Sequence, residues 1–336
     1  MMKLTVKDIA KAANVSPATV SNALNNRKGV SEEIKQNVLK AARELGYTRE
    51  TASDKSTIRL VIFKRHGYVV NDTPFFSSLI EGIEKECRQQ GYQLLISHIS
   101  IMEKDFREII AGLNNDSASG MLILATEMLS EDLELFGNYR NPIVLLDSCL
   151  RDSNINSVLI NNEDASFRAT SYLIENGHTE IGYIGSSAFI KNFFYRRQGF
   201  LDALHEARIA VKKEYLISVE PTMEGAYRDM SAFLENNKNL PTAFFADNDT
   251  IAFGVMRALK EKGVNIPKDV SIIGFDDMPF CEITSPRLTT IKVFKQEMGS
   301  TAVKRLMSLM TEGGGPSQKI QINTELIVRD SVRDQK

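Results

Sequence analysis

The sequence has few residues of the types that build disulfide frameworks or metal sites. Its 336 residues include three cysteines and four histidines. The cysteines are far apart, odd in number and without any Cys-x-x-Cys pair: Cys87, Cys149 and Cys281. The histidines likewise lack the spacing of metal ligands: His66, His98, His178 and His205. We therefore expect free thiols in a reducing compartment, with no disulfide and no bound metal.

Long apolar segments are also missing. No apolar run approaches the length that a membrane-spanning helix needs. The amino-terminal segment, which a secretory signal would make apolar, is interrupted by Lys3, Lys7, Asp8 and Lys11. These absences predict a soluble protein that stays in the cytoplasm and has no membrane partner.

Catalytic and nucleotide-binding motifs are absent as well. The glycine run Gly313–Gly315 is followed by Pro316, and not by the Gly-Lys-Ser/Thr of a phosphate-binding loop. The chain has neither a nucleophile elbow nor a dinucleotide-binding fingerprint. We therefore interpret it as a binding protein that is not an enzyme, and we expect no cofactor.

What the sequence does contain is an ordinary globular composition with an uneven charge distribution. Hydrophobic residues make up 43% and charged residues 25%, and 336 residues are too many for one typical domain. Residues 1–49 carry nine Lys or Arg against four acidic residues, a charge of +5, which leaves −7 for the remainder of a chain of net charge −2. A basic module on an acidic body suits a polyanionic partner, although modest imbalances also occur in domains that bind none.

Three short helices are predicted in the first 47 residues. Thr5 precedes the first, 6–13, and Ser16 caps the second, which runs from Pro17 to Leu24. A third starts after Ser31 and runs to Leu45. A helix, a tight turn and a second helix with small polar residues at its exposed positions are the layout of a helix-turn-helix. From the pattern alone, a three-helix bundle without a DNA-binding role remains an alternative.

The rest of the chain alternates apolar strands with amphipathic helices after a polar linker, 48–57. The predicted strands are 58–63, 92–97, 121–125, 143–147, 181–185, 215–219, 243–246 and 270–275. The predicted helices are 76–90, 104–113, 131–139, 165–176, 195–207, 224–236 and 251–262. Two such sets indicate two α/β lobes with parallel sheets. The later segments 288–291, 294–310, 320–322 and 326–328 suggest that the chain returns from one lobe to the other.

Motifs along most of the chain resemble those of one family, the lactose/galactose repressors. The headpiece stretch VKDIAKAANVSPATVSNALN, Val6–Asn25, carries the densest resemblance. Further matches are Gly29-Val30-Ser31, Ala41-Ala42, Leu45-Gly46-Tyr47, Gly177-His178, Ile181–Gly185, Arg196, Gly199-Phe200, Asn248-Asp249, Gly263–Pro267, Asp269–Asp277 and Leu288–Ile291. The resemblance makes a helix bundle without a DNA-binding role a remote possibility.

The resemblance implies an architecture and a function. The body is expected to look like a periplasmic sugar-binding protein, in which three crossover strands join two lobes around a ligand. The implied domains are a headpiece, 1–47, a linker, 48–57, a first lobe, 58–160 with 292–320, and a second lobe, 161–291 with 321–330. We expect a homodimeric transcriptional repressor with one headpiece per operator half-site, controlled by a small sugar-like effector.

Several headpiece side chains are expected to contact operator DNA. Ser16 and Thr19 can donate to phosphates at a helix start, whereas Asn22 can pair with adenine in the major groove. By family resemblance, Pro17 and Ala18 also face base edges, where they offer only apolar contact. The full set of expected DNA contacts is Thr5, Ser16, Pro17, Ala18, Thr19, Ser21, Asn22, Asn25 and Ser31.

The linker departs from the family pattern. Relatives place a hinge helix there, whose leucine wedges into the minor groove and kinks the DNA. Residues 48–57 are shorter and contain no Leu, Ile, Met or Phe. We hypothesise that the wedge is absent, so that affinity depends more on phosphate contacts and therefore on salt. A disordered tether without a specific role is the alternative.

The expected effector site draws residues from both lobes. Phe75 and Phe76 open a helix after a strand in the first lobe, and Asp147 ends another strand there. The second lobe contributes family positions that touch effector: Arg196, Asn248 and Asp276. Structural alternatives are that one Phe is simply core and that Asn248 and Asp276 cap or brace loops.

Two nearby segments are less informative about the effector. The stretch 219–223 lacks the second aromatic on which some relatives stack their ligand. In the loop 64–73, either His66, Tyr68 or Asp72 lines the cleft, or the loop is only surface.

Two other functions compete with a metabolite-controlled repressor. The body can instead bind a partner protein, as in a global regulator, or the chain can be a cytoplasmic sugar-binding or transport component. The headpiece argues against the second alternative.

Overall fold

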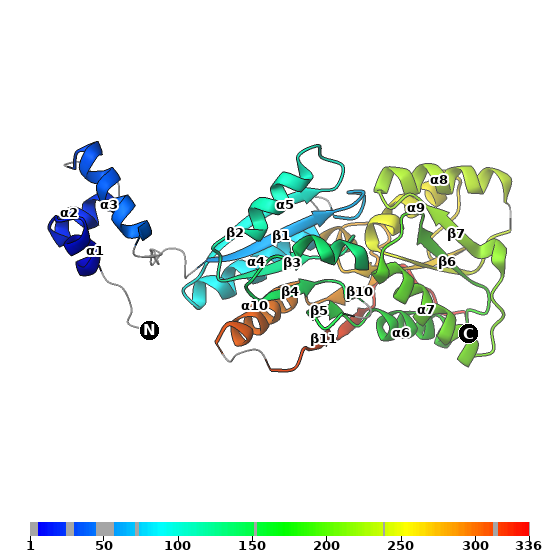
Figure 1. Ribbon diagram of the computed structural model, residues 1–336. Helices are drawn as coiled ribbons and strands as arrows, with labels where there is room; N and C mark the ends of the chain where they lie inside the picture. Colours follow the sequence, from blue (N-terminus) through cyan, green and yellow to red (C-terminus); the bar gives the residue numbers. More distant parts are fainter. Residues whose placement is uncertain are drawn as a thin grey trace. The chain divides into compact units, whose positions relative to one another are not determined.

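The computed structural model describes residues 6–24, 30–44, 57–70, 74–150, 153–237, 239–311 and 315–335. The chain divides into two compact units, residues 1–55 and 56–336 (Figure 1). Each unit has its own core of buried apolar residues. None of the helices in the described ranges is long and apolar enough to cross a membrane. The predicted contacts Thr5 and Asn25, and linker residues 48–56, lie outside the described residues, whereas Thr57 already belongs to the first strand.

The smaller unit is the predicted helix-turn-helix module. Its helices are α1 (Val6–Ala12), α2 (Pro17–Leu24) and α3 (Glu32–Glu44). Their inward faces form a small core: Ile9, Ala10, Ala13, Val20, Ala23, Val38, Ala41 and Ala42. Asn14 makes the turn between α1 and α2 with φ 52°, a conformation that Asn tolerates better than most residues. The Ser16 hydroxyl then accepts a hydrogen bond from the backbone N–H of Thr19 at 3.0 Å, which caps α2 as predicted.

The larger unit contains two six-stranded sheets, one in each lobe. The first sheet has the strand order β11-β5-β4-β3-β1-β2. Its strands are β1 (Thr57–Lys64), β2 (Gln93–Ser100), β3 (Gly120–Leu124), β4 (Ile143–Leu146), β5 (Asn156–Ile160) and β11 (Lys319–Ile322). The second has the order β12-β10-β9-β8-β6-β7. Its strands are β6 (Ile181–Ser186), β7 (Leu216–Val219), β8 (Ala243–Ala246), β9 (Ser271–Asp276), β10 (Thr289–Val293) and β12 (Thr324–Ile327). All neighbouring strands are parallel except β10 and β12.

Helices cover both faces of each sheet. In the first lobe, α4 (Pro74–Gln89) packs with α10 (Lys295–Thr311), and α5 (Phe106–Asn114) with η2 (Ser130–Phe136) belongs to a separate core. In the second lobe, α6 (Asn162–Glu175) packs with α7 (Lys191–Glu206), and α8 (Met223–Asn236) with α9 (Asp249–Glu261). Two short 3-10 turns complete this lobe: η3 (Lys213–Tyr215) and η4 (Pro279–Glu282). The buried apolar faces of these layers match the predicted amphipathic pattern.

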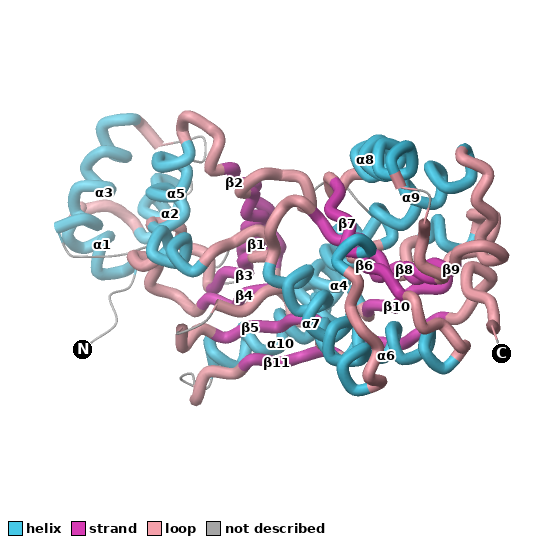
Figure 2. Tube along the Cα trace, turned by 90° about the vertical axis from the view of Figure 1, so that its right-hand side faces the viewer, coloured by secondary structure: helices cyan, strands magenta, loops and turns pink. Residues whose placement is uncertain are grey.

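The chain crosses between the lobes three times, as predicted. It crosses from β5 to α6, from β10 to α10, and from β11 to β12. In Figure 1, α10 (orange) therefore lies beside first-lobe elements, although second-lobe strands precede it in the sequence. Figure 2 shows β3, β4, β5 and β11 in succession across the first sheet. The first sheet includes β11 up to Ile322, two residues beyond the boundary expected at 320.

Strand β5 and the helix expected over 131–139 differ most from the predictions. Strand β5 was not predicted, because it starts with the polar residues Asn156 and Ser157. The structure accommodates Asn156 in a buried strand because its Oδ1 accepts hydrogen bonds from Arg305 Nε (2.8 Å) and from the backbone N–H of Gln318 (2.9 Å). The helix predicted over 131–139 is the shorter 3-10 element η2, Ser130–Phe136.

Close packing of α6 on α7 depends on Gly199. A Cβ at this position would lie 2.0 Å from the backbone oxygen of Glu163, so the two helices would have to separate. We expect Gly199→Ala to destabilise the body by ~1–3 kcal/mol or more in urea denaturation, as overpacking does. Gly112→Ala in α5 is the matched control, because a Cβ there meets nothing within 4 Å and alanine favours a helix. Equal unfolding midpoints for Gly199→Ala and the parent would contradict the expectation.

Candidate functional site

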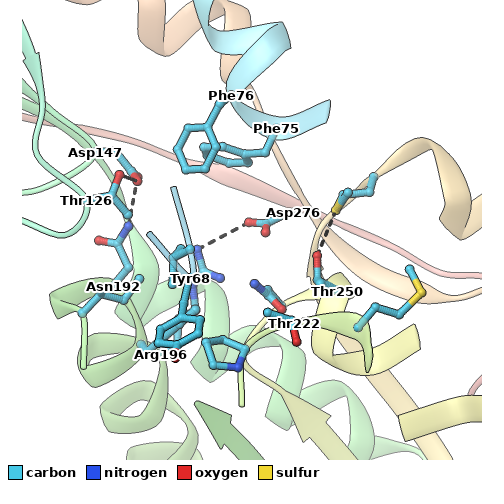
Figure 3. Close-up of a pocket in the computed structure, with 17 residues that line it drawn as sticks. Tyr68, Phe75, Phe76, Thr126, Asp147, Asn192, Arg196, Thr222, Thr250 and Asp276 are labelled. Atoms are coloured by element: carbon cyan, nitrogen blue, oxygen red, sulfur yellow. Dashed lines mark hydrogen bonds and ion pairs between the residues drawn. The ribbon is translucent and has the colours of Figure 1, made fainter. Parts of the chain in front are cut away.

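The predicted effector residues lie along one cavity between the two lobes. The cavity measures about 140 Å³ and lies where the carboxyl ends of the strands of both sheets meet, the usual place for a ligand in parallel α/β sheets. All six predicted residues line it: Phe75, Phe76, Asp147, Arg196, Asn248 and Asp276. Figure 3 shows the side chains converging from both lobes.

Asp147 connects the lobes at one end of the cavity. It follows β4 with φ 62°, an uncommon conformation for a residue other than glycine, and its side chain is buried. Its Oδ2 accepts a hydrogen bond from Thr126 Oγ1 (2.7 Å) in the first lobe, and its Oδ1 accepts one from Asn192 Nδ2 (3.0 Å) in the second (Figure 3). The carboxylate is thus oriented by one donor from each lobe.

Arg196, on α7 of the second lobe, is held rigidly by its hydrogen bonds. Its Nε donates to Asn162 Oδ1 (2.8 Å), and one terminal nitrogen donates to the backbone oxygen of Asp247 (2.6 Å). The other terminal nitrogen lies 3.4 Å from Asp276 Oδ1, and the guanidinium stacks 3.6 Å above the centre of the Phe275 ring. Because all these contacts are buried, Arg196 is already ion-paired and oriented before any ligand binds.

The cavity is rich in acidic groups. Burial raises the pKa of Asp147 to about 6, although hydrogen bonds from Thr126 and the charge of Arg196 oppose the shift. Burial also raises the pKa of Asp276, against the opposing charges of Arg196 and Lys295. The Lys295 ammonium donates to the backbone oxygen of Asp276. Two carboxylates therefore face the cavity, and the guanidinium beside them already has a partner, so the site suits hydrogen-bond donors better than anions.

Asn248, Phe75 and Phe76 each combine a structural role with a place in the cavity lining. Asn248 does cap a helix, because its Oδ1 accepts a hydrogen bond from the Ile251 N–H (2.9 Å) at the start of α9. Phe75 and Phe76 form an edge-to-face pair with ring centres 5.0 Å apart. Both rings belong to the apolar core and also line the cavity, so core and cavity roles coexist in each.

Other cavity residues were not found from the sequence. The lining residues that the sequence did not single out are Val69, Thr126, Ile190, Asn192, Phe193, Pro221, Thr222, Met223, Thr250 and Met278. Asn192 was missed because α7 was predicted to start at residue 195, whereas the helix begins at Lys191 without a side-chain cap. Of the three loop residues considered earlier, Tyr68 lines the cavity, His66 Nδ1 lies 3.1 Å from Glu127 Oε1, and Asp72 lies outside the described residues.

The predicted DNA-contacting residues that the structure describes lie on the outer side of the headpiece. Ser16, Pro17, Ala18 and Ser31 are exposed. Three more are partly exposed on α2: Thr19, Ser21 and Asn22. Exposed small side chains at the start of a second helix allow close approach to a groove, which is the arrangement of a helix-turn-helix reader.

Together, the module and the two-lobed body define a ligand-responsive DNA-binding protein. Comparison with known proteins identifies the family. Residues 5–50 match the model for bacterial regulatory proteins of the lacI family, and residues 170–332 match that for a periplasmic binding protein-like domain. The chain is 32% identical over 334 residues to the HTH-type transcriptional repressor PurR of Actinobacillus pleuropneumoniae serotype 3, with 98% of each chain covered. It is 33% identical over 338 residues to the probable HTH-type transcriptional repressor ExuR of Bacillus subtilis, again with 98% of each covered.

Solved structures have the same architecture. A putative transcriptional regulator LacI from Bacillus cereus subsp. cytotoxis matches with a TM-score of 0.75 and 27% identity, covering 84% of this chain and all of that one. A LacI family regulator from Enterococcus faecium with bound ribose matches at 0.70 and 26%, covering 83% and 100%. The chain belongs to the LacI family of bacterial regulatory proteins: it is a DNA-binding transcriptional repressor controlled by a small-molecule effector, and not an enzyme.

Proposed function

We propose that the effector of this repressor is a neutral polyhydroxyl compound, a sugar, bound by Phe75, Phe76, Asp147, Arg196, Asn248 and Asp276. The observation that supports this most is the pair of buried carboxylates, one from each lobe, that face the same cavity. Carboxylates accept hydrogen bonds from hydroxyl groups, and an aromatic wall suits the apolar face of a sugar ring. Since Arg196 is paired with Asp276, an anionic ligand gains little from it. The ribose in the Enterococcus faecium relative agrees with this class.

A thermal-shift screen tests the proposal. The panel contains ribose, cellobiose, a uronate, a sugar phosphate and a nucleoside, each against the full chain. A neutral sugar should raise Tm, because a ligand that binds only the folded state stabilises it by mass action. Stabilisation by the uronate or the nucleoside alone would contradict the assignment.

Operator and effector should also influence each other. Coupling between two sites is reciprocal, so saturation with operator DNA should change the affinity for the active sugar by the factor with which the sugar changes operator affinity. If operator DNA left the affinity for every tested sugar unchanged, the protein would bind DNA without allosteric control by these ligands. Because operator DNA lies in the bacterial cytoplasm, we place the protein there.

Operator preference is expected to depend on Asn22. We propose that Thr5, Ser16, Pro17, Ala18, Thr19, Ser21, Asn22, Asn25 and Ser31 contact the operator, and that Asn22 pairs with an adenine. Asn22→Ala should lose ~1–3 kcal/mol of discrimination at one base pair, measured by binding-site selection. The control is Lys40→Ala on the exposed side of α3, which should leave the selected sequence unchanged. The same selected motif for Asn22→Ala and the parent would refute the role of Asn22.

We also propose that the repressor acts as a homodimer. The edge strand β2 exposes Leu95 (42%) and Ile96 (43%), and the second lobe exposes Phe280 (47%) and Ile283 (74%). Exposed apolar surface of this kind is typical of a protein–protein interface. When the same patches of two subunits meet each other, the result is a closed dimer with two-fold symmetry. Ile283→Asp should shift the sedimentation equilibrium to monomer, whereas Phe189→Asp, at an exposed aromatic outside both patches, should not. A parent chain that is monomeric at all concentrations would favour a partner protein on these surfaces instead.

A further inference from the structure

Glu127 is a buried carboxylate that does not line the effector cavity. It follows β3, and its side chain has no exposed surface. Both carboxylate oxygens accept hydrogen bonds from the backbone of one loop segment, residues 65–70. Oε2 accepts from the N–H groups of Arg65 (2.8 Å), His66 (3.0 Å) and Gly67 (2.8 Å), and Oε1 accepts from those of Val69 and Val70 (both 3.0 Å). One side chain thus binds five of the six backbone amides of this loop.

This arrangement requires an ionised carboxylate. Burial raises the pKa of Glu127, but hydrogen bonds from His66 and from the loop amides outweigh the effect and lower it to about 2. Gly67, with φ 71°, allows the loop to curl so that successive amides point at one anion. Two further contacts hold the loop: Arg65 pairs with Asp132 at 2.6 Å, and Val70 packs in the apolar core.

The loop places one aromatic ring at the cavity. Tyr68 is the only residue of segment 65–70 whose N–H does not bind Glu127; its backbone nitrogen lies 3.2 Å from His66 Nδ1. The Tyr68 ring lines the cavity, as Figure 3 shows, and 48% of the residue is exposed. The loop leads toward α4, which carries Phe75 and Phe76 into the same cavity. A ligand in the cavity can cover the exposed part of a ring that is fixed at the cavity edge.

We propose that Tyr68 covers the bound effector with an aromatic face, and that Glu127 is the positioning residue that holds Tyr68 there by binding the loop amides. The inference rests on the proposed function of the cavity as the effector site. It also supplies the second aromatic that the stretch 219–223 lacks. Glu127 touches no ligand in this arrangement and acts only through the loop.

A single introduced tryptophan can test the positioning. The chain contains no tryptophan, so Tyr68→Trp gives a fluorophore at one known place. In this background, Glu127→Gln exchanges one carboxylate oxygen for an amide that cannot accept the loop N–H groups. We expect lower fluorescence anisotropy and stronger acrylamide quenching of the introduced indole. Glu134→Gln, an exposed acid on the neighbouring η2, is the matched control and should change neither. Unchanged anisotropy in Glu127→Gln would overturn the positioning role without any knowledge of the effector.

A double-mutant cycle tests whether Tyr68 covers the bound effector. The ligand probe is the member of the sugar panel above that shifts Tm most. We expect Tyr68→Ala and Glu127→Gln each to weaken its binding about tenfold or more, and the double variant to be no weaker than the worse single variant. Operator binding by the effector-free protein should stay unchanged in all three. Phe189→Ala, which removes an exposed ring outside the effector cavity, should leave effector affinity unchanged.

The outcomes separate this inference from the proposed function. If a sugar bound Tyr68→Ala as tightly as the parent, the proposal that Tyr68 covers the effector would fail. The proposed effector site would not be affected by that result. Additive losses in the double variant would show that Glu127 acts on the effector independently of Tyr68, which contradicts the inference. If no panel member shifts Tm, the proposed effector class fails, and the anisotropy still decides whether Glu127 positions Tyr68.

Discussion

Arg196→Met is expected to lose the response to effector and to destabilise the body by ~3–5 kcal/mol, the usual effect of breaking a buried ion pair from one side. The substitution leaves the Asp276 carboxylate buried without its cation. It also removes the donors to Asn162 Oδ1 and to the backbone oxygen of Asp247. Urea denaturation measures the loss of stability, and titration with the active sugar measures the loss of binding.

Two further variants show whether charge burial is the cause. Adding Asp276→Asn to Arg196→Met should recover part of the lost stability, because no uncompensated carboxylate remains. Arg257→Met is the matched control, since Arg257 pairs with Glu224 and Glu261 on the surface, where such pairs contribute ~0–1 kcal/mol. If Arg196→Met were no less stable than Arg257→Met, the buried network would not stabilise the body as described.

Effector binding is expected to weaken by up to about tenfold for each pH unit below 6, because the ionised fraction of Asp147 falls by that factor. Burial raises the pKa of this carboxyl to about 6, and only the carboxylate can accept every hydrogen bond that ligand hydroxyls donate. Between pH 7 and 8 the affinity should be constant. Asp147→Asn should bind the sugar weakly at every pH and should lack the step near pH 6. Isothermal titration calorimetry across this range measures both profiles.

The contribution of Asp147 to the stability of the effector-free protein should grow as pH falls, whereas effector affinity should weaken as pH falls. The folded-state pKa of Asp147 lies above the ordinary value of 3.8, so the folded protein binds more protons than the unfolded chain between these values. The contribution of Asp147 to stability is therefore fully present below pH 4 and is lost as pH rises toward 6. Burial also raises the pKa of Asp247 to about 6 and that of Asp249 to about 7, so the comparison with Asp147→Asn is needed to isolate this residue. Parent and variant profiles that run parallel would contradict the assignment.

Much of the fold follows from neighbouring residues in the sequence. Ser16 and Pro17 specify the start of α2 through a hydroxyl cap and a preset backbone angle, and both act within one turn. Alternating apolar and amphipathic segments predicted the two sets of strands and helices, because each element must bury one face. The position of Asp147 at the end of a predicted strand placed it in the cavity, and family resemblance added Arg196, Asn248 and Asp276.

Other features depend on partners that are distant in sequence, and only the tertiary structure decided them. Strand β5 begins with Asn156, which is acceptable in a buried sheet only because Arg305 and Gln318 donate to it. Glu127 has no local signature, since the loop amides that it binds lie 57 to 62 residues earlier in the chain.

The sequence by itself therefore determined the helix-turn-helix, the two α/β lobes and the family, because caps and periodicity are properties of short segments. Only the tertiary structure brings together the residues that enclose the cavity. The hydrogen bond from Asn192 to Asp147 spans 45 residues and both lobes, and burial alters the charge preference of a carboxyl only once the surrounding side chains are packed around it.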